Sequence, residues 1–393
     1  MNRLLAPRVV LAVFVLLSIG AGIQRVALGP SDVEGRTYTH YNNYVIFTQS
    51  FVHLAAGQDL YVAYPEEHWD FYKYSPTFAA LMAPFAALPD AIGVVVWGLA
   101  GSLALFFGLW RLPVGDERSR MAAAWFLTLP LLQSLQNSQS NHHLAGLVLL
   151  TAVWLEAQKS ASAAAAAALA FFLKIYGGAA VVLAAMYPWR ARFGLRLAAW
   201  LVVLGLLPLL FVTPAQLLFL YKSWAGLLAA DHSASTGVSV MGWMRNWFGI
   251  EPPKTIVAAV GLVIMLAPLV RLRAYADPAF RAVFLAGLLI WLVIFNHKAE
   301  PNTFIIAVTG VAVWFIARPR RWWSVALVTA VFVFTCLSTT SIFPLVIRRT
   351  LVQPYSLRVL PCILVWVVAV ADLMQWPISA PASSSRRTAS AAS

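Results

Sequence analysis

The stretch at residues 76–110 reads PTFAALMAPFAALPDAIGVVVWGLAGSLALFFGLW, and this nearly uncharged run decides the fold class. A membrane-spanning helix needs about 20 apolar residues, so the run is too long for one span. Pro84 and Pro89 divide it, because proline interrupts the hydrogen bonding of a helix interior. The pattern therefore predicts a short helix, followed by a full spanning helix from about Ala91.

The rest of the chain has the same character. It has 393 residues, of which 61% are hydrophobic and 11% are charged, whereas soluble domains carry roughly 25% charged residues. About 240 hydrophobic residues would fill roughly a dozen membrane spans. This composition excludes an ordinary soluble enzyme and a disordered chain.

Apolar segments recur along the whole chain, separated by charge, proline or glycine. We expect an all-α polytopic membrane protein with about 12 transmembrane helices (roughly 10–13). Two of the segments are short and meet at Lys174, and interrupted helices of this kind often line a site in membrane proteins. The segments lie at about 9–24, 76–110, 121–133, 143–157, 161–173, 176–188, 197–212, 255–270, 282–296, 302–317, 322–340 and 358–375.

Basic residues are unevenly distributed when the chain is threaded through twelve spans from an internal N-terminus. One side then receives 17 of the 28 basic residues and 5 of the 15 acidic residues. Cytoplasmic loops carry such an excess of Lys and Arg. We therefore expect a multi-pass protein of the inner (plasma) membrane with both termini in the cytoplasm. The net charge of +13 is then mostly a topology signal, and no nucleic-acid partner is expected.

This topology defines the domain organisation. Residues 1–377 are expected to form a single integral membrane domain, and residues 378–393 a disordered cytoplasmic tail. The external loops are then 25–75, which carries short helices, and 213–254. Because the internal loops are short and rich in arginine, the chemistry is expected on the external side.

The sequence gives little sign of a cofactor. Cys336 and Cys362 lie in apolar segments and are expected to be buried small side chains. His142 and His143 have no further ligand at metal-binding spacing nearby, and no nucleotide-binding or hydrolase motif is present. No cofactor or metal site is predicted, with a divalent metal left open as an alternative.

Aromatic, amide and acidic side chains are dense in the first external loop, which contains HYNNY at 40–44 and YPEEHWDFYKYSP at 64–76. Aromatic faces stack on sugar rings, and a carboxylate can act as a general base on an acceptor hydroxyl. The alternative is an interfacial aromatic belt with solvated charges. The candidate bases are Glu67 and Asp70, which we favour, and Glu66 and Glu34. The candidate sugar or acceptor contacts are Asn42, Tyr44, Trp69, Tyr74, Asn141 and His142.

Several Lys and Arg residues lie at segment boundaries that the charge count places outside. This is unexpected, because Lys and Arg are enriched in cytoplasmic loops. A bound phosphate would explain them, and contact with anionic lipid headgroups is the alternative. Arg348, Arg349 and Arg358 flank one such boundary. The candidate phosphate ligands are Lys174, Lys73, Lys298 and Arg245.

The order of these motifs resembles glycosyltransferase family 87, whose members are polytopic enzymes with a GT-C fold and include mannosyltransferases that use polyprenol-phosphate-mannose. The resemblance covers about residues 30–180, and the C-terminal half matches only in its helix layout. It rests on Leu54-x-x-Gly57-x-x-Leu60-Tyr61, Tyr72-x-Tyr74-Ser75-Pro76-x-Phe78, Pro84, Leu88-Pro89, Trp97, Gln139-x-Asn141 and Leu173-Lys174.

The resemblance implies a reaction. Such enzymes move a hexosyl group from a polyprenyl-phosphate carrier to a lipid or glycan acceptor on the external face, with inversion at the sugar. An acidic residue of the first loop acts as base, and basic residues hold the leaving phosphate. The family's usual Asp, about fourteen residues before Gly57, corresponds here to Asn43. An amide cannot accept that proton, so the base has moved, the activity has been lost, or the register differs.

Two other classes of function remain as alternatives. A transporter or flippase of lipid-linked substrates would use similar interrupted helices, although such proteins usually show paired repeats and none is evident here. A catalytically inactive scaffold for envelope assembly is the other alternative, because of Asn43.

Overall fold

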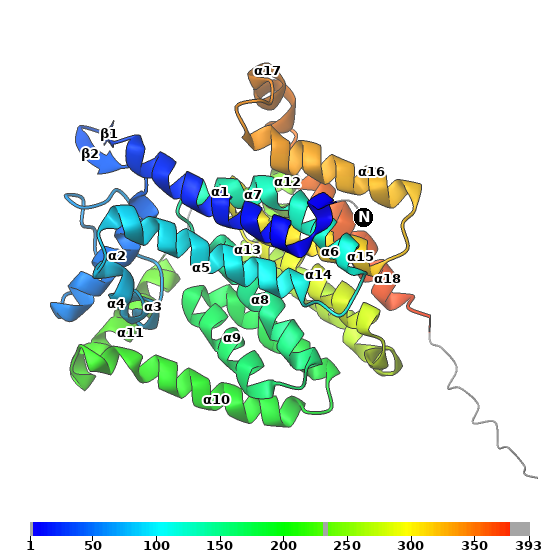
Figure 1. Ribbon diagram of the computed structural model, residues 1–393, viewed down its shortest axis with the longest axis horizontal. Coiled ribbons are helices and arrows are strands. Elements are labelled where there is room, and N and C mark those ends of the chain that lie inside the picture. The colour runs from blue at the N-terminus through cyan, green and yellow to red at the C-terminus, as the bar shows by residue number, and fades with distance from the viewer. Residues whose placement is uncertain (1–2, 231–234, 378–393) are drawn as a thin grey trace, which may run out of the picture.

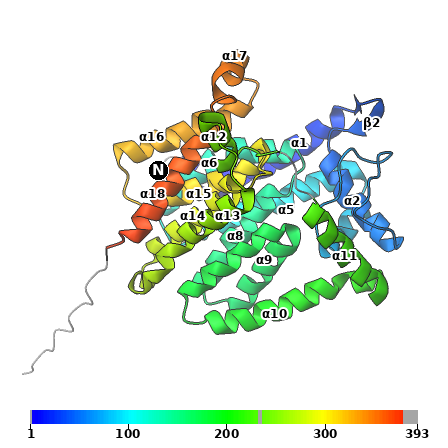
Figure 2. The same cartoon turned by 180° about the vertical axis from the view of Figure 1, so that it is seen from behind.

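The computed structural model describes residues 3–230 and 235–377 as a helical bundle with a small β-hairpin (Figures 1 and 2). The expected tail at 378–393 lies outside the described residues. The α-helices are α1 (Pro7–Ala27), α2 (Asn42–Ala55), α3 (Pro76–Leu81), α4 (Ala83–Ala86), α5 (Asp90–Trp110), α6 (Glu117–Phe126), α7 (Thr128–Gln136), α8 (Asn141–Glu156), α9 (Ser160–Leu173), α10 (Arg190–Leu206), α11 (Pro214–Ala230), α12 (Val240–Phe248), α13 (Lys254–Leu266), α14 (Pro278–Ile294), α15 (Phe304–Ala317), α16 (Trp322–Ala330), α17 (Leu345–Ile347) and α18 (Leu360–Met374).

Shorter elements complete the chain. Strands β1 (Pro30–Val33) and β2 (Arg36–Thr39) pair antiparallel in the first loop. The 3₁₀ helices are η1 (Arg3–Leu5), η2 (Ile175–Met186), η3 (Leu207–Leu210), η4 (Ala267–Val270), η5 (Leu272–Ala276), η6 (Pro301–Thr303) and η8 (Leu337–Thr339), and the π-helical turns are η7 (Val331–Cys336) and η9 (Arg348–Val352).

The fold class is that of an all-α membrane protein, as the sequence predicts. Four helical stretches are long and apolar enough to cross a membrane: Pro7–Ala27, Asp90–Trp110, Arg190–Leu210 and Trp322–Thr339. Six shorter apolar helices accompany them in the described part of the chain. The count of twelve spans stays a prediction.

The prolines divide the long apolar run where the sequence indicates. Short helices α3 and α4 precede the full-length α5, which begins directly after Pro89. The side chain of Ser75 caps α3, because its Oγ accepts the N–H of Phe78 at 3.1 Å. The same hydroxyl donates to the carbonyl of Phe172 at 2.7 Å, so it ties the end of the first loop to α9.

The interruption at Lys174 is also confirmed. Its backbone is extended (φ −149°, ψ 125°), and it separates α9 from η2. α9 is rich in alanine, and most of its alanines are buried. Small side chains let helix backbones approach closely inside a membrane, so α9 packs against both α8 and α10, its neighbours in Figure 1.

Helices α14 and α15 form the centre of the bundle and are buried along most of their length. Around them, α5 packs tightly on α8 at Gly101, where an added Cβ would lie 2.4 Å from atoms of His142 and His143. The peripheral segment from α10 to η3 instead exposes large apolar side chains such as Leu195 and Leu210. In a membrane protein such a face contacts lipid.

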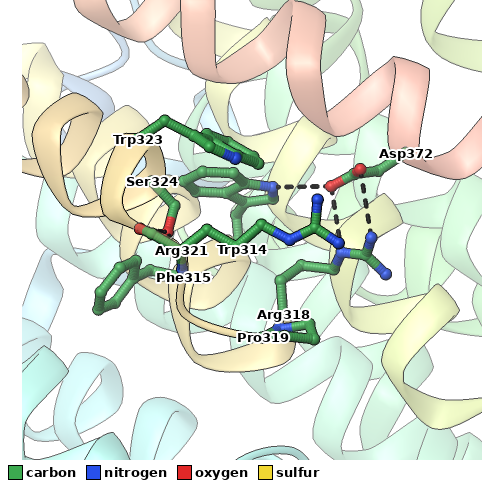
Figure 3. Close-up of a pocket in the computed structure, with 8 residues that line it drawn as sticks. All are labelled: Trp314, Phe315, Arg318, Pro319, Arg321, Trp323, Ser324 and Asp372. Carbon is green, nitrogen blue, oxygen red and sulfur yellow. Dashed lines mark hydrogen bonds and ion pairs between the residues drawn. The ribbon is translucent and has the colours of Figure 1, made fainter.

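Loops that the charge count assigns to the internal side contact one another. Arg281 pairs with Glu156 at 2.6 Å, and Arg318 pairs with Asp372 at 3.1 Å. Figure 3 shows the second pair in a small pocket, where the indole N–H of Trp314 also donates to Asp372. Charges at internal-side loops are thus neutralised by partners from distant segments.

Loops assigned to the external side are also in mutual contact. The amide of Asn43, at the start of α2, donates to the carbonyl of Asn137 at 2.9 Å. The N–H of Val238 donates to the carbonyl of Ala299 at 2.8 Å. At Gly237 (φ 59°), an added Cβ would meet the carbonyl of His297 at 2.5 Å, so the two segments touch through their backbones. Loops that lie on the same side of a membrane are expected to contact one another in this way.

Candidate functional site

Lys174 is the centre of a polar cluster among the loops that the charge count assigns to the external side. Its Nζ donates to Oδ1 of Asn141 at 2.7 Å, where α8 begins. The ammonium also lies 5.7 Å from the ring centre of Tyr74 and 5.9 Å from that of Tyr176. The break between α9 and η2 therefore presents a cation that is oriented by one amide and two aromatic faces.

The partners of Lys174 join four separate parts of the chain. The amide of Asn141 donates to the carbonyl of Asn302 at 3.1 Å, in η6. The hydroxyl of Tyr74, just before α3, forms a hydrogen bond of 3.1 Å with Ser140. The side-chain oxygen of Asn302 is buried and has no hydrogen-bond partner within the described residues. The cluster thus includes a buried acceptor that no described residue uses.

The charges of two carboxylates, Glu300 and Asp70, affect the pKa of Tyr74 in this cluster. Burial raises the pKa of the Tyr74 hydroxyl, and its hydrogen bond with Ser140 lowers it. The negative charges of Glu300 and Asp70 raise that pKa further, so both lie within electrostatic reach of the hydroxyl. Asp70 pairs with Lys73 at 3.2 Å, and its side chain is 51% exposed. It is therefore accessible from outside the bundle.

The other candidate bases are held elsewhere in the first loop. Glu67 pairs with His53 at 3.1 Å, and Glu66 pairs with Arg36 at 3.4 Å. Glu34 occupies the turn between β1 and β2, with a positive φ of 53°. None of these three is among the charges that act on Tyr74.

The amides at the start of α2 have different surroundings. Oδ1 of Asn42 accepts the N–H of Trp69 at 3.4 Å, and its buried Nδ2 has no partner within the described residues. The Trp69 ring is 49% exposed and packs edge-on against Tyr38. Trp69 thus presents an open aromatic face, the unpartnered donor of Asn42 is buried, and Asn43 is engaged by the backbone of Asn137.

Two predicted contact residues lie in the packed interior. Tyr44 is fully buried, and its hydroxyl donates to the carbonyl of Phe85. His142 is fully buried as well, and its Nδ1 bonds to Ser134 at 2.9 Å. The structure therefore brings together Tyr74, Asn141 and Lys174, and it keeps Tyr44 and His142 apart from solvent.

The remaining predicted cations lie on other segments of the chain. Lys73 is engaged with Asp70, and Arg245 on α12 lies 3.9 Å from Glu251. The backbone N–H of Lys298 donates to Oδ1 of Asn296, in the loop that leads to Glu300. Lys174 is directly oriented by this polar cluster, through Asn141 and the ring of Tyr74.

Sequence reasoning did not assign roles to Tyr176, Ser140, Asn302 and Glu300. The signals available were weak: Ser140 lies in the polar run before α8, and Glu300 and Asn302 lie in a polar run at a segment boundary. Among the residues that the structure describes, no three His, Cys, Asp or Glu side chains lie close enough together to hold a metal ion.

Comparison with known proteins identifies the family. The family model of glycosyltransferase family 87 matches residues 71–294, which is more than half of the chain. A search of curated proteins finds no match. The matched region includes Tyr74, Asn141 and Lys174, the three predicted residues that the cluster brings together. The chain therefore belongs to glycosyltransferase family 87 and is a membrane glycosyltransferase.

Proposed function

We propose that this glycosyltransferase moves a mannose-like hexosyl group from a polyprenyl-phosphate carrier to a hydroxyl of a lipid or glycan acceptor. The reaction takes place on the external face of the plasma membrane, with both termini in the cytoplasm. The charge distribution supports this orientation. The contacts among loops assigned to the same side support a two-sided arrangement of the loops.

The observation that carries the proposal is the orientation of Lys174. A lysine among apolar helices is expensive unless it faces a cavity or a partner. Here Asn141 fixes the ammonium, and the rings of Tyr74 and Tyr176 flank it. A phosphate oxygen is the ligand that such a cation accepts best, because a charged hydrogen bond is about twice as strong as a neutral one. In the proposed reaction Lys174 binds the carrier phosphate and stabilises its charge as it leaves.

The acceptor side requires a base. We assign this role first to Asp70, because its charge reaches Tyr74 and its side chain is half exposed. The acceptor oxygen bonds to the anomeric carbon of the sugar, its proton passes to the Asp70 carboxylate, and the bond from that carbon to the phosphate oxygen breaks. The acceptor oxygen attacks from the side opposite the phosphate, so the configuration of the sugar inverts.

Glu67 is the second candidate for the base, and Glu66 and Glu34 follow. Glu67 lies beside the His53 imidazole, Glu66 pairs with Arg36, and Glu34 lies in the turn between β1 and β2. None of the three is among the charges that act on Tyr74. Glu300 is an addition from the structure, since its charge also acts on that hydroxyl. Asn42 and Trp69 are proposed to contact the sugar or the acceptor.

The test is sugar transfer by purified protein in lipid vesicles, with a panel of radiolabelled polyprenyl-phosphate sugars and membrane lipid extract as acceptor. Transfer from one donor that Asp70→Asn reduces by roughly 10²–10⁴-fold supports the assignment. Glu67→Gln, Glu66→Gln, Glu34→Gln and Glu300→Gln complete the series. Retention of near wild-type turnover by all five variants would show that the base lies elsewhere. Absence of transfer from every donor would refute the proposed reaction.

A further inference from the structure

A short arm between α16 and α18 has features that glycosyl transfer does not use. Residues 341–359 include α17 and η9, and in Figures 1 and 2 α17 stands away from the bundle. The arm exposes large apolar side chains, of which Ile342 (82%) and Val346 (72%) are the most open. An exposed apolar surface next to basic residues is typical of a segment that lies in the membrane interface.

Two arginines lie at the base of this arm. Arg348 begins η9, and Arg358 lies two residues before α18. The chain reverses between them: the N–H of Leu357 donates to the carbonyl of Val352 at 3.0 Å, and Ser356 adopts a positive φ of 50°. The two arginines lie on either side of this turn, and the charge of Arg348 acts on Arg358.

Neither arginine has an acidic partner among the residues that the structure describes. The Nε atoms of Arg348 and Arg358 are buried and have no hydrogen-bond partner within the described residues. No carboxylate from the described residues forms an ion pair with either side chain. Burial and the positive charge of Arg348 lower the pKa of Arg358 to about 10. The two cations therefore repel each other where water is partly excluded.

The internal-side pocket provides a contrast within the same protein. There Arg318 lies beside Asp372 (Figure 3). Its guanidinium also lies 4.8 Å from the ring centre of Trp376. Its charge is balanced by the protein itself. At the arm, Arg348 donates to the carbonyl of Phe343 at 3.4 Å, but no described carboxylate pairs with Arg348 or Arg358. An external anion would supply the missing negative charge.

The arm is held in place by α12. The indole N–H of Trp247 donates to the carbonyl of Tyr355 at 2.6 Å, and Nδ2 of Asn246 donates to Oγ of Ser356 at 2.8 Å. Trp247 packs in turn with Trp243. Tryptophans are enriched at the level of lipid headgroups. The turn with the two arginines is thus fixed beside an aromatic cluster suited to that depth.

We propose that Arg348 and Arg358 together bind the phosphate of a membrane lipid, whose chains lie along the apolar side chains of the arm. The lipid is either an anionic phospholipid or the polyprenyl phosphate carrier, since both present a phosphate ester on a hydrocarbon chain. The proposal concerns binding, and it does not depend on Lys174 or on the identity of the sugar.

The experiment measures lipid binding to the purified full chain in neutral detergent by native mass spectrometry. The probes are phosphatidylglycerol, polyprenyl phosphate and inorganic phosphate. Arg348→Gln and Arg358→Gln are expected to weaken binding of at least one of the two lipids by roughly tenfold or more, because each removes a charged hydrogen bond. Loss of phosphatidylglycerol binding identifies a phospholipid site, and loss of polyprenyl phosphate binding identifies a carrier site.

Arg349→Gln is the matched control, since Arg349 is an exposed neighbour on the same turn. It should change binding less than about twofold, as surface charges contribute little. The thermal unfolding of lipid-free protein separates binding from a structural role. Removing one of two repelling charges should leave the unfolding temperature of Arg358→Gln unchanged or higher.

Four results would overturn the proposal. The first is wild-type affinity for both lipids in Arg348→Gln and Arg358→Gln. The second is an equal loss in Arg349→Gln, which would indicate a diffuse charge effect. The third is a lower unfolding temperature of lipid-free Arg358→Gln, which would indicate that the arginine supports the fold itself. Binding of inorganic phosphate as tight as that of the lipids would refute the role of the apolar arm.

Discussion

The hydrogen bond between Lys174 and Asn141 can be tested by exchanging Asn141 for leucine. The variant Asn141→Leu keeps the approximate volume of the side chain and removes the oxygen that accepts Nζ at 2.7 Å. It also removes the donor to the carbonyl of Asn302. Without that acceptor the ammonium is flanked by aromatic rings alone and is free to turn away from a bound phosphate.

The magnitude follows from the kind of bond that is lost. A hydrogen bond to a charged group contributes about 1.5–3 kcal/mol, which corresponds to a roughly 10–150-fold change in affinity. Lys174→Met removes the cation itself and should weaken phosphate binding at least as much. Because Asn141 acts through Lys174, the double variant should be little worse than Lys174→Met alone. The coupling between the two changes is therefore expected to be about 1.5–3 kcal/mol, within the usual range for residues in contact.

The assay is a titration of wild type, both single variants and the double variant with polyprenyl phosphate, which is the carrier without its sugar. Lys222→Met is the control, because this lysine is exposed on α11. It should leave the affinity within about twofold of wild type. Additive losses in the double variant would refute the reasoning, since they would mean that Asn141 and Lys174 act independently. Unchanged affinity in Lys174→Met would remove Lys174 from the phosphate site.

Three further outcomes are expected. Asp70→Asn should lower turnover by roughly 10²–10⁴-fold with little change in carrier binding, whereas Asp32→Asn in the same loop should keep wild-type turnover. Gly101→Ala should lower the free energy of unfolding by about 1–3 kcal/mol, because its Cβ would collide with two histidine rings of α8. Gly194→Ala, which meets no atom within 4 Å in α10, should instead stabilise by about 0.5–1 kcal/mol, as measured by thermal or denaturant unfolding. Gln58→Cys should react with an impermeant thiol reagent on intact cells, and labelling only after permeabilisation would overturn the proposed orientation.

The helix interruptions were predictable because each depends on one residue and its immediate neighbours. Pro84 and Pro89 divide the apolar run regardless of what packs around it, and α5 begins directly after Pro89. Lys174 separates two runs of small and apolar residues for a similarly local reason. The number of spans is harder to predict from the sequence. Six apolar helices are short, and whether each one crosses the membrane depends on the helices that pack around it.

The composition of the site was only partly predictable, because its contacts join distant parts of the chain. Asn141 meets Lys174 across 33 positions and meets Asn302 across 161 positions. No local pattern encodes such pairs. Composition also does not tell which face of α2 is packed inward. Tyr44 and Asn43 are adjacent in a polar run, but Tyr44 is fully buried and Asn43 reaches the end of α7.

The surroundings of Asn43 bear on where the base of this chain lies. Its Nδ2 donates to the backbone carbonyl of Asn137 at 2.9 Å, so the side chain serves as a donor that ties α2 to the end of α7. A carboxylate has no hydrogen to donate, and at this position it would face a carbonyl oxygen with a like partial charge. An aspartate here would therefore lose the tie between α2 and α7 unless the backbone moved. The amide is consistent with a local structure built around a donor, and a base in this chain is more readily supplied by a carboxylate such as Asp70, whose charge already acts on Tyr74.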